Sequence, residues 1–206
     1  MTRRVTRPLS RPLSRPLSRP LSGPLSVPAE SLEPKLFDLE EGRFRYSVWR
    51  NLSIGVWAAQ ADLDAATRVV QLGMHMREQH PSGHSSVVFV LAGAPAPTAE
   101  AQAVLARLFD PRNDLSCTAI VVEGDGFWAS GIRMAITGVH LAEPSSRVKL
   151  RINESIDQVL DWLPAAHYES TGVEITRAQL NRLLASARAA GANRREAESG
   201  AAPRKP

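Results

Sequence analysis

A continuous apolar run, from Ser86 to Ala92 (SVVFVLA), is the segment that most restricts what this chain can fold into. Successive side chains of an extended strand point to opposite faces of a sheet, so an uninterrupted apolar run needs cover on both faces. Helices packed against the sheet provide that cover in α/β proteins. The run therefore predicts a central strand of an α/β domain.

The flanking segments alternate between apolar and polar or small residues, as half-buried strands do. This alternation predicts two strands, over 44–49 and 54–58, joined as a hairpin through residues 50–52. Further strands are predicted over 118–123 and 147–152. In the last of these, Arg147, Lys149 and Arg151 occupy one face, which is typical of an edge strand that resists pairing with another molecule.

Helices are predicted between these strands from their capping residues and apolar spacing. Asp62 and Thr98 are expected to cap the first two helices, and Asn153 a fourth helix that ends at Leu163. The third, over 127–141, is apolar nearly all round and is expected to be largely buried. A capping box over 176–179 begins a last helix that ends at Gly191.

These elements predict a single α/β domain with a mixed sheet of about five strands in the order ββαβαβαβα, helices packed on it, and an extra C-terminal helix. Four segments follow from this reading. Residues 1–35 form a disordered tail, 36–166 the α/β domain, 167–191 an appended helical segment, and 192–206 a second disordered tail.

The first tail is a tetrapeptide repeat, Arg-Pro-Leu-Ser, that begins at residues 7, 11, 15 and 19. A proline every four residues prevents helix formation and favours extended backbone. The repeat has two interpretations, a duplicated segment without selected function or a set of phosphorylation sites. In the second, a basophilic kinase would modify serines that lie three residues after an arginine: Ser10, Ser14, Ser18 and Ser22.

The positive charge of the chain is concentrated at its two ends. Residues 1–29 hold six arginines and no acidic residue, whereas residues 30–190 hold 15 basic and 19 acidic residues. Nucleic acid is therefore expected to bind only through the tails, if at all.

No targeting segment or membrane-spanning apolar run is recognised, so a cytoplasmic protein without membrane association is expected. The single cysteine, Cys117, is expected to be buried and inert.

Three side chains are candidates for binding a ligand or a partner at the carboxyl ends of the central strands, where open α/β sheets usually bind ligands. They are Thr98, Asp125 and Arg133, of which Arg133 is the single formal charge in its predicted helix. Together they could meet a small anion or a nucleotide. The loop 124–129 formally matches a relaxed dinucleotide fingerprint, but it does not lie in the first strand-helix unit, so a tight turn is favoured instead.

No catalytic residue, metal site or cofactor is predicted. The five histidines, at positions 75, 80, 84, 140 and 167, do not have the spacing of a metal site and are expected at the surface. Trp49 and Trp57 could be exposed anchors for a partner or part of the core, and the sequence leaves both interpretations open.

The element order, the apolar strand from Ser86 to Gly93 and the late helix from Ser155 to Leu163 together resemble the STAS family of anti-anti-sigma factors, over about residues 44–163. The resemblance implies a mixed sheet with helices, no catalysis, and regulation by binding another protein. It also implies a phosphorylated serine in the loop after the third strand. In this chain Thr98 is the hydroxyl residue in that loop, and no aspartate precedes it there, so Thr98 is a candidate phosphorylation site or a plain helix cap.

The sequence therefore predicts a non-enzymatic regulatory or protein-interaction module of STAS-like type, whose partner is another protein. The alternative is a small-anion or nucleotide-binding protein, or an enzyme acting on such a ligand, that uses the cleft at the carboxyl ends of the strands.

Overall fold

The computed structural model describes residues 35–40 and 43–200, with side chains described from residue 43 to residue 192. The Arg-Pro-Leu-Ser repeat and the candidate phosphorylation sites Ser10, Ser14, Ser18 and Ser22 lie outside the described residues, as does the end of the second tail.

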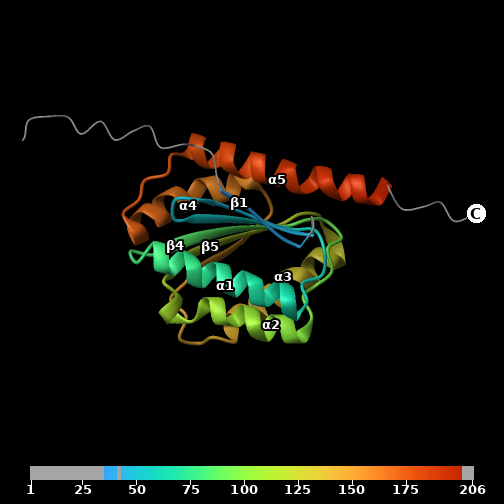
Figure 1. Cartoon of the computed structure of the whole chain (residues 1–206), viewed down its shortest axis with the longest axis horizontal. Helices are drawn as coiled ribbons and strands as arrows, with labels where there is room; N and C mark the ends of the chain where they lie inside the picture. Colours follow the sequence, from blue (N-terminus) through green and yellow to red (C-terminus); the bar gives the residue numbers. More distant parts are fainter. Residues whose placement is uncertain (1–34, 41–42, 201–206) are drawn as a thin grey trace, which may run out of the picture. The chain divides into compact units, whose positions relative to one another are not determined.

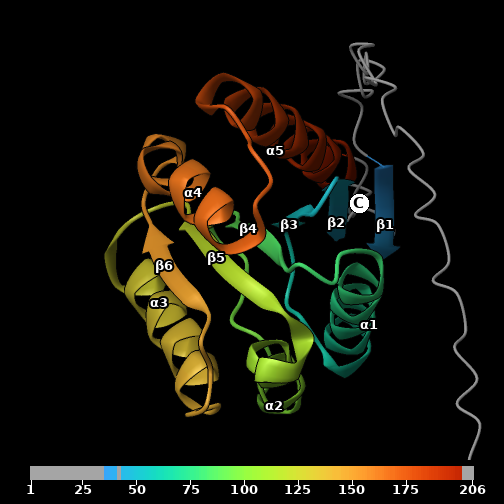
Figure 2. The same cartoon turned by 90° about the vertical axis from the view of Figure 1, so that its left-hand side faces the viewer.

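The core of the molecule is a six-stranded mixed sheet, which lies between layers of helices (Figure 1). Its strands lie side by side in chain order, as the labels in Figure 2 show. The first three strands pair antiparallel, and the remaining pairs are parallel. The predicted α/β class, the mixed sheet and the hairpin are confirmed. The strands are β1 (Lys35–Glu40), β2 (Phe44–Trp49), β3 (Leu52–Trp57), β4 (His84–Val90), β5 (Leu115–Val122) and β6 (Lys149–Asn153).

One strand was not predicted. β1 pairs with β2, with Lys35 opposite Val48, and extends the sheet beyond the hairpin. Its sequence, KLFDLE, does not alternate between apolar and polar residues, so its strand character comes from pairing with a neighbour rather than from its own pattern. At the opposite edge lies β6, with Lys149 and Arg151 exposed, as predicted for an edge strand.

Helices cover both faces of the sheet (Figure 2). The inward side chains of α4 and α5 pack against one face, around Phe89 and Val121, and those of α1, α2 and α3 lie over the other, around Val88 and Ile120. β4 and β5 are therefore buried on both sides, as the apolar run predicted. The helices are α1 (Leu63–Gln79), α2 (Ala99–Leu105), α3 (Gly126–Leu141), α4 (Ile156–Thr171) and α5 (Arg177–Gly200), with short 3-10 turns at Ala106–Phe109 and Pro111–Asn113.

Three predicted helix starts are confirmed by their capping hydrogen bonds. The Asp62 carboxylate accepts from the amide of Ala65 at 3.0 Å, and the Thr98 hydroxyl accepts from the amide of Ala101 at 3.2 Å. In the capping box of α5, the Gln179 amide donates to the Thr176 hydroxyl and the Gln179 side chain accepts from the Thr176 amide.

The predicted start and end of α4 were wrong. Its N-cap is Ser155, whose hydroxyl accepts from the Gln158 amide, whereas Asn153 ends β6 with its side chain amide donating to the Arg151 carbonyl. The helix then continues through Pro164 to Thr171. It continues because its buried face extends past the proline, through His167, and this packing outweighs the local helix-breaking tendency.

The predicted end of α5 at Gly191 was also wrong, because the helix runs on to Gly200. Gly191 is buried where α5 crosses β3, and a Cβ atom on it would lie 2.5 Å from Val56 Cγ1. The glycine therefore allows the helix to approach the strand closely rather than ending the helix.

The expectation that α3 is largely buried was wrong as well. Ala129, Ile132 and Val139 face the sheet, but Phe127 is 94% exposed and Met134 is 72% exposed. An apolar composition on all sides does not bury a helix that has the sheet and α2 on its inner side and no described element over its outer face.

Candidate functional site

The three side chains predicted at the carboxyl ends of the strands are not joined by a hydrogen bond or an ion pair in the described part of the chain. Thr98 caps α2, and Asp125 precedes α3 without capping it through its side chain. The Arg133 guanidinium lies 3.5 Å from the Glu154 carboxylate, from Nη2 to Oε1. The anion site therefore stays a prediction, and Arg133, the one cationic side chain proposed for it, already lies beside a carboxylate.

Two histidines expected at the surface are buried, and His167 belongs to a polar pair between α4 and β4. His167 Nδ1 and Ser85 Oγ are 2.8 Å apart, and neither residue is exposed to solvent. Burial lowers the pKa of His167 to about 4, so its ring is neutral at pH 7. A hydroxyl sealed in this way cannot reach a substrate, and the pair instead satisfies polar groups inside the core. Cys117 lies next to this pair and is buried, as predicted.

Residues 35–40 and 43–200 contain neither a cluster of metal ligands nor a helix that could cross a membrane. There, no three histidine, cysteine, aspartate or glutamate side chains converge as ligands for a metal ion. Over the same residues, none of the helices combines the length and the apolar character needed to cross a membrane.

The exposed face of α3 carries an apolar stripe, here called the α3 stripe. Its large side chains are Phe127, Met134 and Leu141, which are 94%, 72% and 69% exposed. Gly131 and Gly138 lie between them, and apart from their chain neighbours and the backbone of α3 itself, nothing lies within 4 Å of the position that a Cβ would take on either glycine. The stripe is thus an uncharged helical surface with large side chains and open spaces in alternation.

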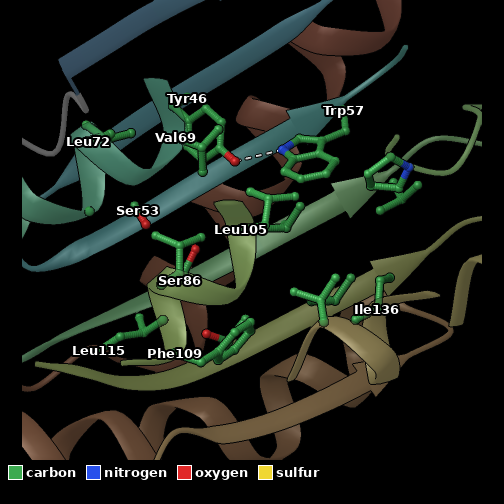
Figure 3. Close-up of a pocket in the computed structure, with 18 of the residues that line it drawn as sticks. Tyr46, Ser53, Trp57, Val69, Leu72, Ser86, Leu105, Phe109, Leu115 and Ile136 are labelled. Carbon is green, nitrogen blue, oxygen red and sulfur yellow. Dashed lines mark hydrogen bonds between the residues drawn. The ribbon is translucent and has the colours of Figure 1, made fainter. Parts of the chain in front are cut away.

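A cavity of about 100 Å³ lies between the sheet and the three helices on its α1 side (Figure 3). We call it the sheet–helix cavity. Side chains of α1, α2 and α3 form its outer wall, among them Leu72, Leu105 and Ile136, and β2 to β5 form its floor. Most of the lining is apolar.

A row of three hydroxyl groups crosses the floor of this cavity. Ser53 on β3 is opposite Ser86 on β4, and Ser86 is opposite Thr118 on β5, so the three residues lie side by side on one face. Ser53 and Ser86 can be followed in Figure 3. Thr118 is 4% exposed, and its hydroxyl has no hydrogen-bond partner in the described structure; the same is true of Nδ1 of His84, which is 3% exposed.

An aromatic pair closes one side of the cavity. The Trp57 indole donates a hydrogen bond to the Tyr46 hydroxyl at 2.7 Å. The Tyr46 ring lies over Gly55, where a Cβ would be only 2.7 Å from Tyr46 Cε1. Burial raises the pKa of the Tyr46 hydroxyl, which therefore stays protonated. Trp57 thus lines the cavity, and Trp49 is buried in the core of the opposite face, so neither indole is an exposed anchor.

This cavity was not predicted from the sequence, although the sequence contains part of the pattern that could have indicated it. The period-2 pattern places Ser86 on the same face as Val88 and Val90, and Thr118 on the same face as Ile120 and Val122. A hydroxyl residue on a strand face that is otherwise apolar is the sequence feature that could have indicated this polar row. The alignment of the hydroxyls across three strands depends on the register of the sheet, which the pattern of each strand alone does not determine.

No family model, curated protein or solved structure matches this chain.

Proposed function

We propose that this chain is a non-enzymatic regulatory module of STAS-like type that acts by protein–protein contact, and that the α3 stripe is its docking surface. The exposure of Phe127, Met134 and Leu141 on one face of a helix is the observation that carries the proposal. Scattered apolar side chains are normal on protein surfaces, but a contiguous apolar stripe is typical of an interaction site.

The spacing of the stripe supports a second copy of this chain as the partner. Positions 127, 131, 134, 138 and 141 are separated alternately by four and three residues, which is the spacing of a helix–helix seam. Large residues occupy every other position and glycines the positions between. One helix therefore offers both the side chains that insert and the spaces that receive them, as a twofold interface requires.

In an antiparallel pairing of two such helices, Phe127 faces the partner's Gly138 and Met134 faces the partner's Gly131. The glycines allow the two backbones to approach closely along the seam, and no charge has to be desolvated there. An oligomer of this kind joins two modules through their third helices.

The test is the molar mass of the full chain in solution, measured by sedimentation over a range of concentrations. We expect a dimer for the natural sequence and a monomer for Met134→Asp, because each aspartate would be buried in an apolar seam without an opposite charge. The matched control is Tyr168→Asp, which introduces the same charge at a 60% exposed residue of α4, on the opposite face of the sheet.

A monomeric natural chain at about 100 µM, roughly the weak end of specific self-association, would contradict the second copy as partner. A dimer that Met134→Asp leaves intact would contradict the α3 stripe as the surface. Circular dichroism checks that both variants are folded, so that a lower molar mass reports dissociation of the dimer rather than unfolding.

A further inference from the structure

We infer that the sheet–helix cavity is a binding site for a small uncharged molecule that is apolar over most of its surface and carries one hydroxyl or carbonyl group. This inference is independent of the α3 stripe, since the cavity lies on the inner side of α3. It rests on the row of hydroxyls on the floor, on the unpaired polar atoms beside it, and on the composition of the wall.

The unpaired polar atoms are the first argument. Buried polar groups in proteins nearly always have hydrogen-bond partners, because leaving one unpaired costs its full desolvation. The Thr118 hydroxyl and His84 Nδ1 are both more than nine-tenths buried, have no partner among the described residues, and line the same cavity. A valine would fill the position of Thr118 without that cost. Two such groups at one cavity therefore point to a bound molecule that pairs with them.

The row of hydroxyls adds capacity for recognition. The half-buried Ser86 lies between Ser53 and Thr118, so a single oxygen atom of a ligand above Ser86 would be close to hydroxyls from three strands. A hydroxyl can donate or accept, and a neutral histidine offers one donor and one acceptor nitrogen. The floor therefore suits one alcohol, phenol or carbonyl group.

The wall defines the rest of the ligand. The residues that line the cavity include no arginine, lysine, aspartate or glutamate. Burial lowers the pKa of His84 to about 4, so this side chain is neutral at pH 7 as well. A charged ligand would lose its hydration without gaining an opposite charge, which excludes carboxylates and phosphates as ligands. The remaining lining is aliphatic and aromatic, so an apolar body is favoured.

The size and rigidity of the cavity suit a compact ligand. Its volume of about 100 Å³ is of the same order as engineered apolar cavities of about 150 Å³ that bind benzene. The Tyr46 ring is held over Gly55 and hydrogen-bonded to Trp57, so the aromatic side of the cavity is in place before a ligand arrives. A ring of about benzene size with one oxygen matches these dimensions.

Phenol and benzene are the probes that test this inference, because they share a ring and differ in one hydroxyl. Their binding to the full chain is followed by NMR titration, with shifts expected at Thr118 and Ser86. We expect saturable binding of phenol, and weaker binding of benzene. Thr118→Val should weaken phenol binding by about threefold to tenfold, the loss of one neutral hydrogen bond, and leave benzene binding within about twofold.

Thr67→Val is the matched control, because it makes the same substitution on α1, where the hydroxyl bonds to the Leu63 carbonyl and does not line the cavity. It should leave both affinities unchanged. A second variant, Ser86→Phe, should fill the cavity and abolish binding of both probes. Either of two results would overturn the inference: no saturable binding of either probe to the natural chain, or a phenol-to-benzene affinity ratio that Thr118→Val does not change. The latter would mean that ordered water, rather than a ligand, pairs with the hydroxyl.

Discussion

The substitution Thr118→Val is predicted to stabilise the fold. Thr118 is 4% exposed in the middle of the sheet, and its hydroxyl has no hydrogen-bond partner in the described structure. Valine has the same β-branched shape and, like threonine, favours strands, so the exchange removes the unpaired oxygen without creating a cavity.

The magnitude follows from the cost of burying a polar group without a partner. That cost is about 1–3 kcal/mol, and a methyl group in place of the hydroxyl keeps the local packing. We expect the free energy of unfolding to rise by about 1–2 kcal/mol. In a domain of this size a change of 1 kcal/mol shifts Tm by about 2–4 °C, so Tm should rise by several degrees.

The assay is urea denaturation followed by tryptophan fluorescence, with Thr67→Val as the control. The control should change the free energy of unfolding by less than about 0.5 kcal/mol, because its hydroxyl lies on the outer side of α1. The slope of the transition should be equal in all three proteins, so that the midpoints report stability alone. A loss of more than about 1 kcal/mol in Thr118→Val would refute the reasoning, because it would mean that the hydroxyl is paired in solution.

Three further predictions concern other parts of the fold. Gly191→Ala should reduce stability by about 1–3 kcal/mol, since the new methyl meets Val56 at 2.5 Å, and Val56→Ala in the same chain should recover part of the loss in urea denaturation. Thr98→Ala should cost about 1 kcal/mol through loss of the α2 cap while Thr98→Asp retains it; equal losses in thermal unfolding would contradict the capping role. His84 and His167 have pKa values lowered to about 4 by burial, so the unfolded chain binds protons first as pH falls below about 6.5, and stability should decline from there toward pH 4. The decline should be on the order of 2 kcal/mol per histidine by pH 4.5, and His167→Phe should lessen it when urea midpoints are compared at pH 7.5 and 4.5.

The sequence alone determined the class of fold and most helix starts. Strand and helix periodicities are local properties, so the apolar run at residues 86–92 and the alternation in the hairpin identified β4, β2 and β3 correctly. Capping is local too, which is why Asp62, Thr98 and Thr176 were placed correctly.

Tertiary contacts decided the elements that local patterns misplaced. β1 is a strand because β2 offers it an edge, and α4 passes Pro164 because its packed face continues beyond the proline. Gly191 resembles a helix end in the sequence, but in the structure it lies where α5 crosses Val56. Each of these depends on residues far away along the chain, which no local window contains.

The candidate sites divide in the same way. The sequence showed that α3 is apolar on all sides. Which side of the helix is buried depends on how α3 packs in the folded protein, and this packing leaves Phe127 and Met134 exposed. The sequence likewise placed Ser86 and Thr118 in predicted strands, whereas Ser53 stood just before the strand predicted over 54–58, and the structure includes it in β3. Only the register of the sheet brings these hydroxyls into one row, because pairing between strands is a long-range property that the period of a single strand cannot encode.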